Sequence, residues 1–274
     1  MTSATADTAL DVLKTRLKAT WMDGNYDYFS RFMASSAAQF LDPLGLSPGA
    51  ALLDVACGSG QLALVAAERG LKVTGVDIAT NLILAARGRA AAAGLDVRFD
   101  EGDAEALPYR DANFDAVASL YGAMFAPRPE RVVAELLRVC RPGGIVAMGN
   151  WTKEGFVGAM FKTFARFLMP SDLPSPLLWG DEDVVRERFG GGVSNLRLKR
   201  VLYRFDYPFG PADVVEFFRE YYGPATRAFA TLGEAEQAAL RAELVQLWSA
   251  HNTAGVAGRT TVDAEYLDII ATRA

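Results

Sequence analysis

Histidine and cysteine, the side chains that bind zinc or titrate closest to neutral pH, are scarce in this protein. The 274 residues include one histidine, His251, and two cysteines, Cys57 and Cys140, which lie far apart and outside any C-x-x-C pair. A disulfide framework and a zinc site are therefore not expected, and both thiols are expected to be reduced. Stability must come from an apolar core, which a chain of this length can build.

Positive charge is also scarce. The chain has 28 basic and 33 acidic residues and a sequence pI near 5.1, so it has no net attraction for phosphate backbones or anionic membranes. No apolar run reaches the roughly 20 residues that a membrane-spanning helix needs, and the N-terminus shows no basic segment followed by an apolar core. We expect a cytoplasmic protein that binds a small molecule and neither nucleic acid nor membrane.

Short apolar runs alternate with helix-like segments between residues 50 and 150. This pattern is typical of a doubly wound α/β domain, in which crossover helices bury both faces of a mostly parallel sheet. Strands are expected at 51–56, 72–77, 97–100, 114–120 and 144–150, with later strands at 195–207 and 265–272. Helices are expected at 61–69, 80–94, 131–140, 212–222 and 234–250, because Gly70, Gly94 and Pro142 can end the early ones.

Two kinds of segment surround this pattern. Residues 1–45 are rich in aromatics and are expected to form a helical cap of two short helices, while residues 46–274 form the main domain. Helical insertions at 151–194 and 208–262 are expected to cover a substrate. The prolines at 170, 174 and 176 lie in an unusually apolar loop with Trp179, and such a composition suits a lid.

A glycine-rich loop and three acids follow the first three expected strands. The segment ending Ala56-Cys57-Gly58-Ser59-Gly60 closes one strand and opens a helix, so its backbone must turn sharply while a ligand approaches. Asp77 ends the next strand, where such sheets bind ribose hydroxyls. Asp103 follows the third strand and could accept a hydrogen bond from an adenine amino group. Together these strand ends predict an adenosine site.

Other interpretations of the loop stay open. Each glycine or acid taken singly is as easily explained by a tight turn or a solvated loop. The spacing Gly58-x-Gly60-x-x-Ala63 also satisfies the degenerate fingerprint of NAD(P)-dependent oxidoreductases. Asp54 argues against that, because its carboxylate suits an ammonium group and not a pyrophosphate. A third alternative is a protein that binds the nucleoside without catalysis.

The ordered motifs resemble those of class I S-adenosylmethionine-dependent methyltransferases, and above all the quinone-biosynthesis enzymes and related small-molecule enzymes. The resemblance covers residues 50–150 and runs through Leu52 to Gly60, Val76-Asp77, Gly102 to Tyr109, Asn113 to Val117 and Leu136 to Gly144. It implies a seven-stranded sheet whose last strand is antiparallel and lies between the fifth and sixth. It also implies S-adenosylmethionine as the cofactor.

The resemblance further implies a role for each cofactor-site residue. Asp54 lies near the ammonium and Asp77 binds both ribose hydroxyls. Around the methionine part, the implied contacts are Ala56, Cys57, Gly58 and Gly60. Around the adenine they are Ile78, Asp103 and Ala104. Leu120, Tyr121 and Gly122 are implied to lie beneath the sulfonium, and Tyr28 to close over it. The segment after the fourth strand lacks the N-P-P-Y pattern of adenine and amide methyltransferases. No acidic cluster resembles the magnesium site of catechol methyltransferases, so a metal-free reaction is expected.

The acceptor is less defined, because the resemblance does not extend to residues 151–262. His251 is interpreted either as a general base or as a residue at the C-terminus of a helix. Tyr221 and Tyr222 either orient a substrate hydroxyl or belong to the core. Four apolar side chains could line an acceptor cavity: Phe156, Met160, Phe164 and Trp179. If they do, the acceptor is apolar or aromatic. The methylated atom and the oligomeric state stay open, a homodimer included.

Overall fold

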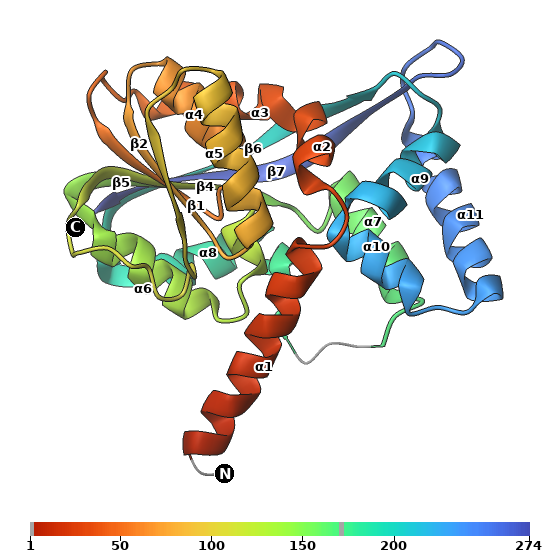
Figure 1. The fold of residues 1–274 in the computed structure, drawn as a ribbon, viewed down its shortest axis with the longest axis horizontal. Coiled ribbons are helices and arrows are strands. Elements are labelled where there is room, and N and C mark those ends of the chain that lie inside the picture. Colours follow the sequence, from red (N-terminus) through yellow and green to blue (C-terminus); the bar gives the residue numbers. More distant parts are fainter. Residues whose placement is uncertain (1–2, 170–172) are drawn as a thin grey trace.

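A computed structural model describes residues 3–169 and 173–274 (Figure 1). Seven strands form one sheet in the order β3-β2-β1-β4-β5-β7-β6. Their bounds are β1 Ala51–Val55, β2 Lys72–Asp77, β3 Val97–Glu101, β4 Phe114–Leu120, β5 Cys140–Trp151, β6 Val193–Tyr207 and β7 Thr260–Arg273. Neighbours from β3 to β5 are parallel, whereas β7 is antiparallel to both β5 and β6. The expected doubly wound sheet, with its last strand between the fifth and sixth, is confirmed.

Helices cover both faces of this sheet. The helices α3 Ala34–Leu41, α4 Gln61–Glu68 and α5 Thr80–Ala92 pack on one face and share a core that includes Phe40, Leu52 and Phe99. The helices α6 Pro129–Val139 and α8 Glu182–Phe189 pack on the opposite face against Val117 and Val146. Strands buried from both sides have few polar positions, which is why β1 and β4 are mainly apolar runs, whereas the edge strand β3 is Val-Arg-Phe-Asp-Glu.

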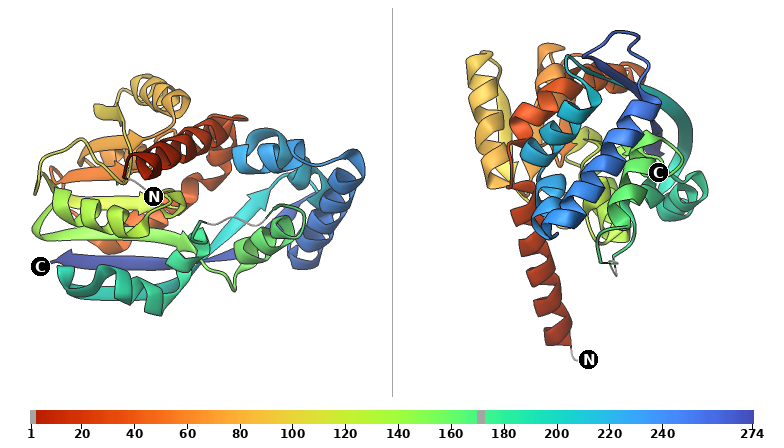
Figure 2. Two further views of the ribbon diagram at one scale, coloured as in Figure 1. Left: turned by 90° about the horizontal axis from the view of Figure 1, so that it is seen from below. Right: turned by 90° about the vertical axis from the view of Figure 1, so that its right-hand side faces the viewer.

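A second helical layer lies beyond the carboxyl ends of the parallel strands. It contains α7 Phe156–Ala165, α9 Pro211–Tyr221, α10 Gly223–Ala230 and α11 Glu234–His251, which gather at one side of the sheet (Figure 2). Helix α11 contacts α7, α9 and β7, and α9 contacts α10. The helices α7, α8 and α10 have no separate counterpart among the expected elements. The expected helical insertions are therefore present, and the sequence left only the bounds of these three helices undefined.

The N-terminal region differs from the two short helices that were expected. It begins with the 19-residue helix α1 Ser3–Trp21, followed by α2 Tyr26–Ser30, a 3-10 turn at Arg31–Met33, α3 and a second 3-10 turn at Asp42–Leu44. The N-terminal part of α1 projects from the body of the molecule (Figures 1 and 2). Its C-terminal end contacts α10. The helix therefore joins the cap to the second helical layer.

The described end of the apolar proline loop packs against the core, where a lid was expected. Pro170 lies outside the described residues, whereas Pro176–Gly180 form a 3-10 turn in which Leu177 and Trp179 are buried. This turn presses on the end of β5, since a Cβ at Gly180 would lie 2.4 Å from the carbonyl oxygen of Trp151. Burying an indole in this way stabilises the core by a few kcal/mol, at about 25 cal/mol per Å² of apolar surface. Among the described residues, no helix is long and apolar enough to cross a bilayer.

Candidate functional site

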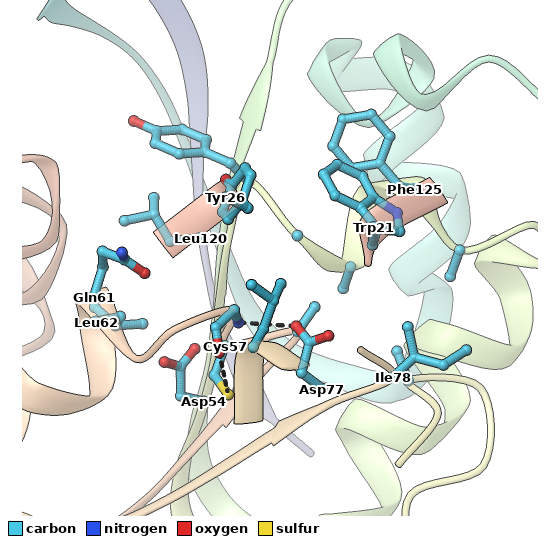
Figure 3. Close-up of a pocket in the computed structure, with 18 of the residues that line it drawn as sticks. Trp21, Tyr26, Asp54, Cys57, Gln61, Leu62, Asp77, Ile78, Leu120 and Phe125 are labelled. Carbon is cyan, nitrogen blue, oxygen red and sulfur yellow. Dashed lines mark hydrogen bonds between the residues drawn. The ribbon is translucent and has the colours of Figure 1, made fainter. Parts of the chain in front are cut away.

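A deep cavity opens at the carboxyl ends of β1, β2, β3 and β4, and α1 and α2 form its roof (Figure 3). It holds about 1100 Å³, including the space at its mouth. Eleven predicted site residues line it: Asp54, Ala56, Cys57, Gly58, Asp77, Ile78, Asp103, Ala104, Leu120, Tyr121 and Gly122. The adjacent strand ends therefore bring these residues together, as expected for a doubly wound sheet.

The loop after β1 follows a backbone path that most residues avoid. Ala56, Gly58 and Gly60 have φ values of 57°, 54° and 86°, all in the left-handed region. The segment after β4 lies directly against it, because a Cβ at Gly122 would be 2.5 Å from the carbonyl oxygen of Ala56. Positive φ costs little for glycine but about 1–3 kcal/mol for other residues, and such strain gathers at binding sites. The two loops thus form a narrow cradle of exposed backbone.

Asp77 connects the ends of β1 and β2. Its Oδ2 accepts a 2.8 Å hydrogen bond from the N–H of Gly58, and its Oδ1 accepts one of 2.8 Å from the N–H of Ala79. Burial raises the pKa of this carboxyl, and the bonds from Ala79 and Gly58 partly offset that rise. Each oxygen keeps a further lone pair. Asp77 can therefore accept two more hydrogen bonds from a ligand diol.

Asp54 lies deeper, with 1% of its surface exposed. Its Oδ2 accepts a 3.1 Å hydrogen bond from the N–H of Ala63. Burial raises its pKa well above the usual range, and the nearby charge of Asp77 adds to this. Within residues 3–169 and 173–274, no cationic side chain forms an ion pair with Asp54 or Asp77. Buried charges are costly unless compensated, so this cavity favours a positively charged ligand.

The acidic loop after β3 is tied to helix α1. Asp103 accepts a 2.8 Å hydrogen bond from the N–H of Glu105 and forms an ion pair with Lys14. Lys14 also lies 2.8 Å from the buried carboxylate of Glu105, and Lys18 pairs with Glu101. These contacts hold α1 across the cavity beside Asp103. Sequence analysis did not identify Lys14 or Lys18, because their partners lie more than 80 residues away in the chain.

The end of the cavity near Gly58 carries polar groups that sequence analysis also missed. The side chain of Gln61 donates hydrogen bonds to the hydroxyls of Ser30 and Ser59, the latter at 3.0 Å. The ring of Tyr26 lies near Gly58, at 3.5 Å from the position a Cβ would take. Figure 3 shows Tyr26 and Gln61 on the side of the glycine loop. The helix-opening position of Gln61, next to the second glycine, was the available signal for it.

Three predicted residues lie outside the cavity lining. Gly60 begins α4 and packs near Phe99, whereas Tyr28 is 41% exposed and contacts Phe217 and Tyr221. Tyr26, and not Tyr28, lines the cavity, and the side chain of the N-cap residue Asn25 accepts a hydrogen bond from the N–H of Tyr28. His251 is exposed at the end of α11, with Nδ1 3.0 Å from the carbonyl oxygen of Leu247. The structure therefore supports its reading as a helix C-terminal residue.

A second, smaller and tightly packed cavity adjoins the first, and its 380 Å³ includes open solvent and the gaps between the atoms of its wall. Its walls are mainly aromatic: Trp21, Tyr26, Phe29, Met33, Tyr121, Phe125, Trp151, Val157, Met160, Phe205, Phe218 and Tyr222. Trp21, Tyr26, Met33, Tyr121 and Phe125 line both cavities. Of the expected acceptor residues, Met160 and Tyr222 lie here, whereas Phe156 and Trp179 are buried in the core outside this wall. The side chains of the wall carry no formal charge.

Comparison with known proteins agrees with this arrangement. A family of methyltransferase domains (Methyltransf_11) matches residues 53–148. An uncharacterized protein of Mycobacterium tuberculosis is 38% identical over 245 residues, covering 85% of this chain and 87% of the relative. A demethylmenaquinone methyltransferase of Thermus thermophilus is 38% identical over 123 residues, covering 43% of this chain and 56% of that enzyme. The YcgJ protein of Bacillus subtilis has the same fold, with a TM-score of 0.59 at 18% identity over 87% of this chain and 98% of that chain.

The methyltransferase match spans β1 to the middle of β5, which is the region that supplies the glycine loop, Asp54, Asp77 and Asp103. The order of the strands and the antiparallel β7 extend the likeness to the rest of the sheet. Because sequence motifs and topology lead to the same class, the chain belongs to the class I S-adenosylmethionine-dependent methyltransferases.

Proposed function

We propose that this methyltransferase transfers the methyl group to a small apolar or aromatic metabolite by in-line displacement without a metal ion. The observation that supports the cofactor site is the pair of buried carboxylates, Asp54 and Asp77, for which no described cation is an ion-pair partner. S-adenosylmethionine carries an ammonium and a sulfonium and would compensate them. The pyrophosphate of NAD(P) would add negative charge beside both acids, so the oxidoreductase alternative is disfavoured.

The cofactor would lie across the strand ends in an extended pose. Asp77 would accept hydrogen bonds from both ribose hydroxyls, because both of its oxygens keep a free lone pair. The adenine would lie beside Ile78, Asp103 and Ala104. The methionine part would lie along the cradle formed by Ala56, Cys57, Gly58 and Gly122, with Asp54 attracting its ammonium. Tyr26 and Gln61 are added to the site on the basis of their position at the same end of the cavity.

When bound, S-adenosylmethionine would supply a methyl group on a cationic sulfur, which would leave as a neutral thioether with the electron pair of the carbon–sulfur bond. The chain's own contribution is to position the acceptor and exclude water. Trp21, Tyr26 and Phe125 line both cavities and enclose their junction. Holding two reactants in line can contribute about 7–11 kcal/mol to a barrier reduction. The good leaving group leaves little need for a Lewis acid.

The composition of the second cavity supports an apolar or aromatic acceptor. Aromatic rings dominate its wall, and an aromatic ligand that packs against them is removed from water at about 25 cal/mol per Å². Its wall contains no Asp, Glu, His, Lys or Arg among the residues that the structure describes. This wall therefore offers no carboxylate or imidazole that could take a proton from the acceptor atom.

Two measurements test this proposal. Calorimetry should show binding of S-adenosylhomocysteine in the micromolar range and no comparable binding of NAD(H). Incubation of a metabolite panel with methyl-labelled S-adenosylmethionine should then label apolar or aromatic compounds. Asp77→Ala should weaken cofactor binding by about tenfold or more, since it removes two hydrogen bonds to ligand hydroxyls. Tight NAD(H) binding without S-adenosylhomocysteine binding would overturn the proposal, and cofactor binding without label transfer would favour a non-catalytic role.

A further inference from the structure

Arg89 lies on α5 and joins segments that are distant in the sequence. Its Nη1 donates a hydrogen bond of 3.0 Å to the carbonyl oxygen of Ser59 and one of 3.3 Å to the Ser59 hydroxyl. The same nitrogen lies 3.5 Å from Oδ1 of Asp27 on α2. Helix α2 also packs against α5 (Figure 1). One guanidinium nitrogen therefore ties α5 both to the glycine loop after β1 and to the roof helix α2.

The bond to Ser59 reaches the sharpest turn of the glycine loop. Ser59 is fully buried and lies between Gly58 and Gly60, whose φ values are 54° and 86°. The side chains of Arg89 and Asp27 are 27% and 19% exposed. A charge-assisted hydrogen bond to a buried acceptor is stronger than an ion pair that solvent reaches. The contact with Ser59 is therefore the stronger of the two, and it fixes the path of the loop along the cavity.

A second set of hydrogen bonds joins α2 to the same serine. The Gln61 side chain donates to the hydroxyls of Ser30 and Ser59, and these two hydroxyl oxygens lie 3.4 Å apart. Ser30 is a buried residue of α2. This helix has only five residues, and a helix of that length is not stable without its neighbours. Ser59 is thus the point at which Arg89, Gln61 and Ser30 meet, and α2 is held against the loop there.

Helix α2 carries Tyr26, which lies over the glycine loop. The Tyr26 ring is 3.5 Å from the position that a Cβ on Gly58 would take, and this residue lines both cavities. Gln61 lies on the same side of the loop (Figure 3). Arg89 is not among the described residues that line either cavity. It can therefore act on a bound ligand only through the loop at Ser59 and through α2.

We propose that Arg89 is a positioning residue for the cofactor. It holds α2 against the glycine loop, so that Tyr26 and Gln61 stay closed over the methionine part of the ligand. Without this charged donor, α2 should separate from the loop more often, and the ligand should leave faster. The inference rests on the proposed function, because it takes the glycine loop as the methionine end of the cofactor site.

The test compares variants of two arginines on α5 in the full chain. Arg89→Met keeps an unbranched side chain but removes the donor, whereas Arg89→Lys keeps a charged donor that can replace the single nitrogen involved. Arg87→Met is the control. The Arg87 guanidinium donates a 3.1 Å hydrogen bond to the carbonyl oxygen of Phe99, and within the described part of the chain no hydrogen bond or ion pair joins it to α2 or the glycine loop.

Two quantities are measured on each variant. Stopped-flow displacement gives the dissociation rate of S-adenosylhomocysteine. Amide hydrogen exchange of residues 26–33 in the ligand-free chain reports how often α2 opens, and exchange in the core strands reports on global unfolding. A residue that only stabilises the fold would change the exchange of both regions together.

Arg89→Met should release S-adenosylhomocysteine about tenfold faster and exchange the amides of residues 26–33 about tenfold faster, as the loss of one hydrogen bond to a charged group allows. Exchange in the core strands should not change. Arg89→Lys should stay within about threefold of the unmodified chain in both quantities, and Arg87→Met should change neither.

The inference is overturned if Arg89→Met changes neither quantity, if Arg89→Lys loses as much as Arg89→Met, or if Arg87→Met has the same effect. Should Arg89→Met not fold, Arg89→Gln, which has a shorter and uncharged side chain, takes its place, and unchanged exchange of residues 26–33 in that variant overturns the inference. Failure of S-adenosylhomocysteine to bind the unmodified chain contradicts the proposed function itself. Hydrogen exchange of the ligand-free chain then still decides whether Arg89 holds α2.

Discussion

The N–H of Gly58 donates a 2.8 Å hydrogen bond to Oδ2 of Asp77, 19 residues further along the chain. This bond joins the glycine loop after β1 to the carboxylate at the end of β2, so the two motifs form one structural unit. The loop at Gly58 has φ at 54°, and a fixed partner for its N–H helps to hold that turn. A change at Asp77 therefore disturbs the loop as well as any ligand, and variants at other positions separate the two effects better.

Asp54→Asn is expected to stabilise the free protein while weakening cofactor binding. The amide oxygen can keep the bond from the Ala63 N–H, and the buried charge disappears. The melting temperature of the free chain should rise by a few degrees, and affinity for S-adenosylhomocysteine should fall about tenfold. Thermal melts and calorimetry on the same samples measure both. The exposed Asp96→Asn is the control and should change neither, and a loss of stability in Asp54→Asn would contradict the assignment.

Cofactor affinity of the unmodified chain is expected to fall as the pH is lowered. The pKa values of Asp54 and Asp77 are raised by burial, so these acids take up protons at higher pH than exposed carboxyls. Protonated Asp54 no longer attracts the ligand ammonium, and protonated Asp77 is a weaker acceptor for the ribose hydroxyls. Ionisation of these two buried acids also lowers the free energy of unfolding of the ligand-free chain as the pH rises through their raised pKa values. Calorimetry of S-adenosylhomocysteine between pH 5.5 and pH 8 measures this. Constant affinity over that range would argue against the two acids as ligand partners.

Lys14→Ala is expected to weaken cofactor binding through helix α1. Lys14 pairs with Asp103 and with the buried Glu105, and without these contacts α1 is held less firmly over the cavity. We expect a loss of about three- to tenfold in affinity, mainly through faster dissociation. Stopped-flow displacement of S-adenosylhomocysteine measures it. The control is Arg16→Ala on the same helix, since Arg16 forms no ion pair with any described residue; equal effects of the two changes would rule out the ion pairs as the cause.

Gly122→Ala should damage the site, whereas Gly88→Ala should not. A Cβ at Gly122 would lie 2.5 Å from the carbonyl oxygen of Ala56 and would force the two loops apart. We expect a loss of about 1–3 kcal/mol in the free energy of unfolding and more than tenfold in cofactor affinity. Gly88 lies in α5 with nothing within 4 Å of its Cβ position, so alanine there should stabilise by up to about 1 kcal/mol. Urea unfolding and calorimetry compare the two, and a fully active Gly122→Ala would show that the loops can separate without cost.

The free energy of unfolding is expected to depend on pH through Asp268, which lies outside the cofactor site. Burial raises its pKa from 3.8 to about 6, although Arg197 and Lys199 partly offset the effect. Because the folded-state pKa is the higher one, the stabilising contribution is present at low pH and is lost as pH rises from about 4 to about 6. Between pH 5 and pH 7.5 the loss is about 1 kcal/mol. Urea unfolding should show a smaller decrease for Asp268→Asn than for the unmodified chain, and identical decreases would contradict the shifted pKa.

The sequence by itself determined the sheet and the cofactor end of the cavity. The early strands were predicted within a residue or two, apart from the longer β5, because centrally buried strands such as β1 and β4 leave mainly apolar runs in the sequence. Gly58 and Asp77 could be placed together because parallel neighbours have their carboxyl ends at the same sheet edge. The order of the strands along the chain and the pattern of buried residues are enough to define which strand ends lie together.

Tertiary structure decided which side chains from distant segments complete the site. Tyr26, and not Tyr28, lines the cavity, and the five-residue helix that carries both residues packs on α9. Lys14 forms an ion pair with Asp103, which lies 89 residues further along the chain. The stacking of Tyr121 on Trp151 depends on a left-handed turn that local sequence does not specify. Helix rotation, long-range ion pairs and enforced backbone strain arise only when the segments pack together, so they are properties of the folded chain.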